Sequence, residues 1–171
     1  MLIEAAPAVT RVLVLRDTSM SPAGLSEAEA TARALLITLE IIEANNPDQF
    51  GDAFAAAVAR GANGVATFAS PFFNYDRKRL IELASRYRLP SIWEATAYVR
   101  DGGLLSYGPS FADMYRRSAG YVAKLLNGVK TSDLPVEQPA KFELGVNLNI
   151  ATALGLAISA TQLARADEVI E

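Results

Sequence analysis

Short hydrophobic runs alternate with longer amphipathic segments over the first hundred residues of the chain. The runs are rich in Val, Ile and Leu or are bounded by Pro and Gly, which is typical of strands buried inside a parallel sheet. They predict four strands, at residues 12–16, 37–42, 64–69 and 91–93. The segments between them have helical periodicity and predict helices over residues 26–36, 46–60 and 75–87. This alternation predicts an α/β protein, with a parallel sheet covered by helices on both faces.

Polar residues at the expected helix starts support these boundaries. Ser26 and Glu29 form a capping-box pair, and Asn46 followed by Pro47 is a strong start for the second helix. Gly61 is placed to end that second helix. The positions expected to face inward from the first helix are Ala28, Ala32, Leu35 and Leu36.

The pattern changes after residue 100. Asp101, Gly102 and Gly103 form a turn signal, and the stretch 101–109 is the best candidate for a hinge. Beyond it, the sequence predicts an extended run at 104–107, a helix over 110–126 capped by Ser110, a strand at 142–148, and short helices at 150–154 and 159–166.

Composition excludes several classes of protein. The chain of 171 residues has 16 Lys and Arg against 19 Asp and Glu, a net charge of −3, which argues against nucleic-acid binding. It has no His and no Cys, which excludes a Ser-His-Asp triad, a thiolate nucleophile and a Cys-ligated zinc site. No apolar stretch reaches the roughly 20 residues of a membrane span. Residues 1–7 do not have the pattern of a secretory leader.

The candidate functional residues follow the predicted strands. In open parallel sheets, ligands bind in the crevice at the carboxyl ends of the strands. Those ends carry Asp17 and Thr18, then Ser70 and Pro71, then Trp93 and Glu94. Each pair also has an ordinary interpretation, as turn residues, as a strand stop or as a core aromatic. Their convergence on one crevice favours a binding site.

Motifs of nucleotide and phosphoryl chemistry are absent from the same positions. No glycine-rich phosphate loop follows the first strand, where Arg16, Asp17, Thr18 and Ser19 stand instead. Asp17 is placed like the acceptor of a response regulator, but no companion acidic pair precedes the strand. We therefore expect no cofactor and no metal.

Three stretches of the sequence resemble a known family. They are LIELASRYRLPSIWE, GGLLSYGPSFADMYRRSAGYVAKLLNGVK and SDLPVEQPAKFELGVNLNIATALGLAISATQLARADEVIE, with residues 134–139, 142–144 and 166–170 the most specific. The chain resembles the substrate-binding proteins of ABC transporters, in particular the group related to tryptophan and tyrosine transport-associated binding proteins.

The resemblance implies a type I periplasmic-binding-protein fold, in which two Rossmann-like lobes close over a solute. This chain matches only the C-terminal half of such proteins. Residues 1–103 would be the C-terminal lobe, and residues 104–171 would be the hinge and the elements that return to the other lobe. The helix after Ser110 and the strand at 142–148 would then leave an apolar face and an unpaired strand edge, so we expect a homodimer that shares them.

The resemblance also implies roles for the strand-end residues, with a small, amino-acid-like solute as ligand. Trp93 would stack on an aromatic or apolar body, and Glu94 or Asp17 would face an ammonium. The hydroxyls of Thr18 and Ser70 would donate to a carboxylate. Pro71 accompanies Ser70 in the site, and Tyr107 would line the cleft from the crossover.

The implied partners are an ABC permease and its ATPase, and the implied location is the periplasm, although residues 1–7 carry no export signal. Three other functions stay open. A ligand-sensing or regulatory domain uses the same fold, but no helix-turn-helix precedes the first strand. A small α/β enzyme has weak support without His, Cys or a phosphate loop. A degenerate half-protein would have lost binding altogether.

Overall fold

The alternating hydrophobic runs form one seven-stranded sheet in the computed structural model, which describes residues 1–171. The strands are Arg11–Arg16 (β1), Thr38–Glu43 (β2), Gly64–Thr67 (β3), Ser91–Trp93 (β4), Leu105–Pro109 (β5), Phe142–Asn147 (β6) and Glu168–Ile170 (β7). The helices are Leu2–Ala5 (α1), Leu25–Ala34 (α2), Gln49–Ala59 (α3), Pro71–Tyr75 (α4), Arg77–Arg86 (α5), Thr96–Arg100 (α6), Phe111–Leu126 (α7), Leu148–Leu154 (α8) and Ala160–Ala164 (α9), with a 3-10 turn at Thr131–Asp133 (η1).

The strands lie in the order β2-β1-β3-β4-β5-β6-β7. The pairs from β2 to β5 are parallel, β6 runs antiparallel to β5, and β7 runs parallel to β6. The predicted α/β architecture is confirmed. The expected unpaired edge on the strand at 142–148 is wrong, because β6 has a strand on each side. The sheet therefore runs straight across the boundary expected after residue 103.

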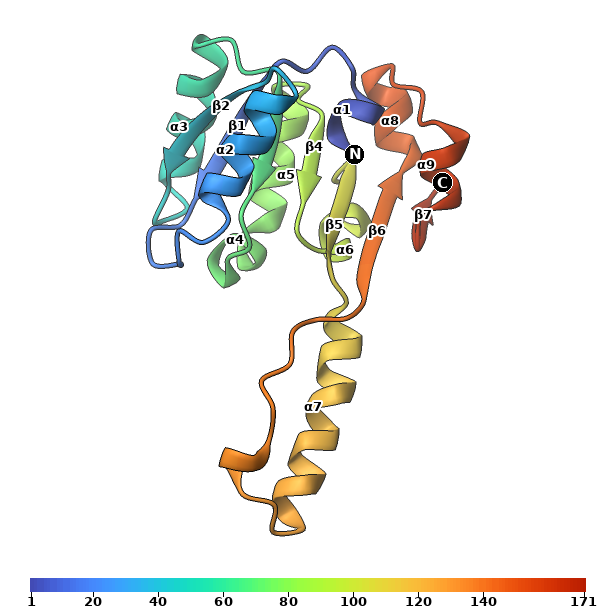
Figure 1. Cartoon of the computed structure of the whole chain (residues 1–171). Helices are drawn as coiled ribbons and strands as arrows, with labels where there is room; N and C mark the ends of the chain where they lie inside the picture. The colour runs from blue at the N-terminus through green and yellow to red at the C-terminus, as the bar shows by residue number, and fades with distance from the viewer.

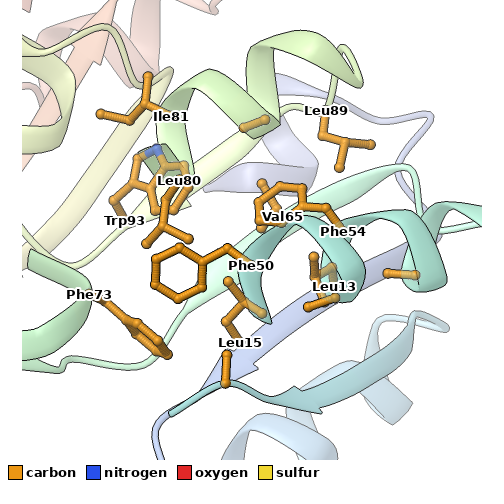
Figure 2. Close-up of a cluster of buried hydrophobic side chains, with 14 of the residues drawn as sticks. Leu13, Leu15, Phe50, Phe54, Val65, Phe73, Leu80, Ile81, Leu89 and Trp93 are labelled. Atoms are coloured by element: carbon orange, nitrogen blue, oxygen red, sulfur yellow. The ribbon is translucent and has the colours of Figure 1, made fainter. Parts of the chain in front are cut away.

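One face of the sheet packs against α3, α4 and α5 (Figures 1 and 2). Leu13 and Leu15 of β1 meet Phe50 and Phe54 of α3 and Leu80 of α5, all with 0% of their surface exposed. Asn46 assists the start of α3, because its side-chain oxygen accepts from the backbone N–H groups of Asp48 and Gln49. The buried residues Phe50, Phe54 and Ala57 recur at helical spacing, so one face of α3 packs on the sheet.

The other face carries α1, α8 and α9 (Figure 1). Val12 and Val14 point to this side of β1, opposite to Leu13 and Leu15, as the two-residue period of a strand requires. Leu105 of β5 and Val146 of β6 continue the same cluster beyond the expected hinge. The C-terminal segment is therefore part of the body of the protein.

Local predictions fail around α2. The capping box expected from Ser26 and Glu29 does not form, because the N-cap is two residues earlier, at Gly24 with φ 88°, and the Ser26 hydroxyl donates to Glu27. Only Ala32 of this helix is buried, while Leu35 and Leu36 beyond its end are 54% and 89% exposed. The short elements α1, α4, α6 and β7 are not among the predicted elements. None of the helices is long and apolar enough to cross a membrane.

Residues 110–141 leave the body as a projecting arm made of α7, η1 and an extended return segment (Figure 1). Ser110 caps α7 as predicted, accepting from the N–H of Asp113 at 3.3 Å. The helix has the predicted amphipathic pattern, yet none of its residues is buried. The apolar side of the arm has no partner within the chain, in agreement with the expected exposed apolar face.

Candidate functional site

The sheet changes its direction of growth between β1 and β3. The chain passes from β1 outward to β2, but from β3 it continues the other way to β4, while β1 and β3 themselves are neighbours. An open α/β sheet has its ligand crevice outside the carboxyl ends of the strands at such a point. Asp17 follows β1 and Ser70 follows β3, so both lie at this crevice.

A cavity of ≈ 200 Å³ lies in the crevice. Arg16, Asp17 and Phe68 line it from the strand ends, and Met20 and Leu25 line it from the loop before and the first turn of α2. A space of this size holds about seven water molecules at bulk density. It therefore suits a small polar group with an apolar contact on one side.

Asp17 is a buried polar group of the crevice and is only 6% exposed. Its Oδ1 accepts from the Ser19 N–H at 2.9 Å and the Ser19 hydroxyl at 2.6 Å, and its Oδ2 accepts from the Ser70 hydroxyl at 2.7 Å. Burial alone would raise the pKa of Asp17, but the hydrogen bonds from Ser19 and Ser70 together outweigh it and lower the pKa. The side chain is therefore an anion that joins the ends of β1 and β3.

Ser70 also organises the start of α4. Its hydroxyl oxygen accepts from the N–H groups of Phe72 at 3.1 Å and Phe73 at 3.4 Å, and Pro71 occupies the first position of the helix. Pro71 and Thr18 are exposed at the rim. Thr18 donates from both its N–H and its hydroxyl to Oδ1 of Asn45. Of the predicted residues, Asp17 and Ser70 thus form the floor of the crevice, and Thr18 and Pro71 form its edge.

Arg16 is a member of the site that sequence reasoning missed. Its Nη1 pairs with Glu43 at 2.7 Å, but its Nε is buried without a hydrogen-bond partner. Phe68 and Met20 are also new members. The sequence offered one usable signal, the position of Arg16 immediately before Asp17. The contribution of Met20 depends on how the loop folds back over the strand ends.

Glu94 lies one strand further along, at the end of β4. It accepts hydrogen bonds from the Thr67 hydroxyl at 2.8 Å and the Tyr98 hydroxyl at 3.0 Å. Burial raises its pKa, and these hydrogen bonds offset the effect only in part. Tyr98 in turn has a raised pKa, because it is buried and lies beside the Glu94 charge. Both oxygens of Glu94 are engaged by neighbours within the chain.

Trp93 lies in the core (Figure 2). Its indole is 1% exposed, stacks on the Tyr98 ring at a centroid distance of 4.9 Å, and donates its N–H to the Ser91 hydroxyl. This placement contradicts the expected stacking role, because such an indole has no free face to offer a solute. The physical reason is that β4 is covered on both sides, so a large aromatic at its end packs inward.

Tyr107 is 44% exposed and stacks on Phe142 at 5.7 Å. Its strand, β5, is the third neighbour from β1, which places it about 14 Å from the crevice in the plane of the sheet. A separate cavity of ≈ 240 Å³ opens nearer to it, lined among others by Asn74, Arg100 and Glu143. The structure therefore joins Asp17 and Ser70 directly, but not Tyr107. The chain has no group of three or more His, Cys, Asp or Glu residues that could hold a metal ion.

Solved structures with the same fold are longer than this chain. The ABC domain from Streptococcus pneumonia in complex with L-Trp is 21% identical with a TM-score of 0.91, over 99% of this chain and 58% of that one. A conserved domain protein from Vibrio cholerae is 25% identical with a TM-score of 0.88, over 98% and 57%. The ligand-free, open form of a substrate binding protein with adhesive properties from Clostridium difficile is 17% identical with a TM-score of 0.69, over 99% and 57%.

These likenesses confirm the predicted periplasmic-binding-protein fold, of which this chain is a partial domain. No curated protein sequence matches the chain. The family model of ABC transporter substrate binding proteins, however, matches residues 4–170, nearly the whole length. Members of this family bind solutes without catalysis and generally act outside the cytoplasmic membrane. On that match, the chain belongs to the ABC transporter substrate binding protein family.

Proposed function

We propose that the crevice between β1 and β3 binds a small amino-acid-like solute, with its charged head group in the ≈ 200 Å³ cavity. The observation that carries this is that two residues of opposite charge, Asp17 and Arg16, line the same cavity. The anionic Asp17 stands beside Arg16, whose buried Nε has no partner within the chain. An ammonium and a carboxylate on one carbon match that pair, because each finds a charge of the opposite sign.

The apolar lining supports an aromatic or otherwise apolar body for this solute. Phe68 and Met20 border the same cavity, and a ring or a thioether contacts such a body well. The relative from Streptococcus pneumonia was solved with L-Trp, and this agrees with a ligand of that class. Thr18, Ser70 and Pro71 complete the rim and floor, while Glu94 belongs to the neighbouring strand end.

The proposal is tested by thermal shift with matched compounds. Tryptophan, tryptamine and indolepropionate share one ring system but differ in the ammonium and the carboxylate. A solute at a hundredfold excess over its Kd stabilises by about 2.7 kcal/mol, or roughly 5–10 °C in Tm for a domain of this size. The amino acid should stabilise more than either analogue.

Charge-neutral variants then assign the partners. Asp17→Asn should remove the advantage of the amino acid over indolepropionate, and Arg16→Gln should remove its advantage over tryptamine. Asp48→Asn is the control, because Asp48 has 93% of its side chain exposed and lies away from the cavity. If no amino acid stabilises the wild-type chain at millimolar concentration, the binding proposal is wrong and the degenerate half-protein becomes the better interpretation.

We further propose that the chain serves an ABC importer outside the cytoplasmic membrane, with a permease and an ATPase as partners. Family membership supports this role. The test is whether the solute-loaded chain stimulates ATP hydrolysis by the cognate permease–ATPase complex in vesicles, and whether the native protein fractionates outside the cytoplasm. Absence of stimulation with solute bound would favour the sensing function instead.

We also propose that the chain forms a homodimer through the arm. Tyr115, Val122 and Leu126 of α7 are 75%, 54% and 83% exposed, and such a contiguous apolar face marks an interaction surface. Light scattering across a dilution series tests this proposal. A monomer at about 100 μM would contradict it, because specific interfaces of standard size have far lower dissociation constants.

A further inference from the structure

Two serine hydroxyls hold the carboxylate of Asp17, and the chain holds them with different firmness. The Ser70 hydroxyl donates to Oδ2 of Asp17 at 2.7 Å and accepts from the N–H groups of Phe72 and Phe73. Ser70 is only 4% exposed, so its hydroxyl has three partners in a buried position. It could leave Asp17 only by giving up an arrangement that also starts α4.

The Ser19 hydroxyl is held by a single hydrogen bond. It donates to Oδ1 of Asp17 at 2.6 Å, has no other partner within the chain and belongs to an exposed residue. A hydroxyl at the surface can exchange such a bond for a bond to water at a modest net cost. Of the two hydroxyls, Ser19 therefore has the one that a ligand can replace.

The loop after β1 would keep its place without this bond. The Ser19 N–H donates to the same Oδ1 at 2.9 Å, and the Met20 N–H donates to the backbone carbonyl of Asp17 at 3.2 Å. Both donors are backbone groups, so neither bond depends on the Ser19 side chain. Met20 therefore stays in the lining of the crevice cavity when the hydroxyl turns away.

An ammonium group would compete with the hydroxyl for Asp17. A carboxylate has about four acceptor positions, and Ser19 fills two of them while Ser70 fills a third. An ammonium has three donors, and its charge makes its bond to a carboxylate stronger than that of a neutral hydroxyl. To bind Asp17 through two donors, it must take the position that the Ser19 hydroxyl occupies.

We propose that the Ser19 hydroxyl is an internal competitor, which holds the position on Asp17 that the ammonium of the solute takes. This inference rests on the proposed function of the crevice and adds the group that the solute displaces. The hydroxyl satisfies the buried carboxylate in the absence of solute. Every solute that binds through an ammonium must break this bond, and a solute without an ammonium need not.

The variant Ser19→Ala removes the hydroxyl and keeps both backbone bonds. Its affinity for tryptophan and for tryptamine should rise by roughly three- to tenfold, the range expected when one competing hydrogen bond is lost. Indolepropionate has no ammonium, so its affinity should not change. Isothermal titration with the three compounds measures these differences, and Ser19→Thr, which keeps a hydroxyl, should bind like the wild type.

The matched control is Ser26→Ala. Ser26 is also exposed, and its hydroxyl also donates to a carboxylate, Glu27, at 2.9 Å, but it does not line the crevice cavity. This variant loses the same kind of hydrogen bond away from the site. It should bind all three compounds as the wild type does.

A second measurement needs no solute. Burial acts to raise the pKa of Asp17, and the hydrogen bond from the Ser19 side chain is the largest of the contributions that lower it. Carboxyl-carbon NMR should therefore show Asp17 titrating at a higher pH in Ser19→Ala than in the wild type. An unchanged pKa of Asp17 would show that the hydroxyl does not hold the carboxylate, and it would overturn the inference.

The other adverse outcomes separate this inference from the proposed function. If the wild type binds neither tryptophan nor tryptamine, the solute site itself is wrong and the inference fails with it. If the wild type binds both but Ser19→Ala binds them no more tightly, the solute site stands and only the displacement is wrong. If Ser19→Ala binds both amines more weakly, the hydroxyl is a ligand of the ammonium and not its competitor.

Discussion

Gly108 is the glycine at which an added side chain would clash most severely with the backbone. It lies near the end of β5, two residues after Ser106, which pairs with Trp93 of β4. A Cβ atom added at Gly108 would fall 1.8 Å from the backbone carbonyl oxygen of Glu94 and 2.8 Å from its carbonyl carbon. Both partners are backbone, so a rotamer change cannot relieve the clash. The Gly108→Ala protein must separate the ends of β4 and β5.

The expected cost follows from that geometry. Inserting a methyl group into a well-packed site costs about 1–3 kcal/mol, and a backbone clash belongs at the upper end. A loss of about 3 kcal/mol lowers the Tm by roughly 6–12 °C in a domain of this length. The damage should also reach the solute crevice, because Glu94 holds Thr67 of the adjacent β3 through its hydrogen bond of 2.8 Å.

Calorimetry and urea unfolding at fixed protein concentration measure this cost. Gly51→Ala is the matched control: Gly51 lies in α3, and nothing comes within 4 Å of an added Cβ there. This control should gain about 0.5–1 kcal/mol, because Ala is the better helix former. If Gly108→Ala unfolds within 0.5 kcal/mol of wild type, the close approach of β4 and β5 at Glu94 is wrong.

Further predictions concern the two carboxylates and the single Trp. Burial raises the pKa of Glu94, so protonation favours the fold, and that contribution is lost as the pH rises through the folded-state pKa. In urea unfolding, wild type should therefore lose stability relative to Glu94→Gln as the pH rises above the ordinary Glu pKa of 4.5; a constant difference would contradict the buried position of Glu94. The hydrogen bonds to Asp17 lower its pKa, so its contribution is present at neutral pH and lost as the pH falls through the lowered value. Wild type should thus lose stability relative to Asp17→Asn only in acid, and the opposite trend would refute the anionic assignment. Trp93 should resist quenching by iodide and keep its emission when a solute binds, because it is 1% exposed, and strong quenching would place the indole outside the core.

The strands β1 to β6 could be predicted because each is a local property of the sequence, whereas β7, of only three residues, could not. The residues of β4, Ser91–Trp93, are the predicted ones, since Pro90 precedes them and the run is hydrophobic. The start of α2 could not be predicted in the same way. Ser26 and Glu29 have the spacing of a capping box, but a turn through Gly24 starts the helix earlier. The Ser26/Glu29 spacing and the turn at Gly24 indicate different helix starts, and the path of the loop in the folded protein favours the start after Gly24.

The candidate site was partly predictable from topology. Asp17 and Ser70 were expected together because parallel neighbouring strands end at the same edge, and their side chains are joined at 2.7 Å. Trp93 shows where that argument stops. Its position at a strand end is a matter of sequence, but the direction of its side chain depends on which helices cover β4. Arg16 was overlooked for a related reason, because an unpaired Nε becomes visible only once its surroundings are known.

The arm shows that the sequence determines the helix α7 but that covering its apolar face requires a binding partner. The amphipathic pattern of α7 predicts a helix with one apolar face, and the helix forms with that face exposed, as expected. By contrast β6, expected to lack a neighbour, lies between β5 and β7, so the body is closed by strands of its own. The apolar face of α7 therefore gains no stabilisation from burial within this chain. A partner that covers this face would gain the free energy of burying it. The body need not rearrange, since only the connections at 109–110 and 141–142 join the arm to the body.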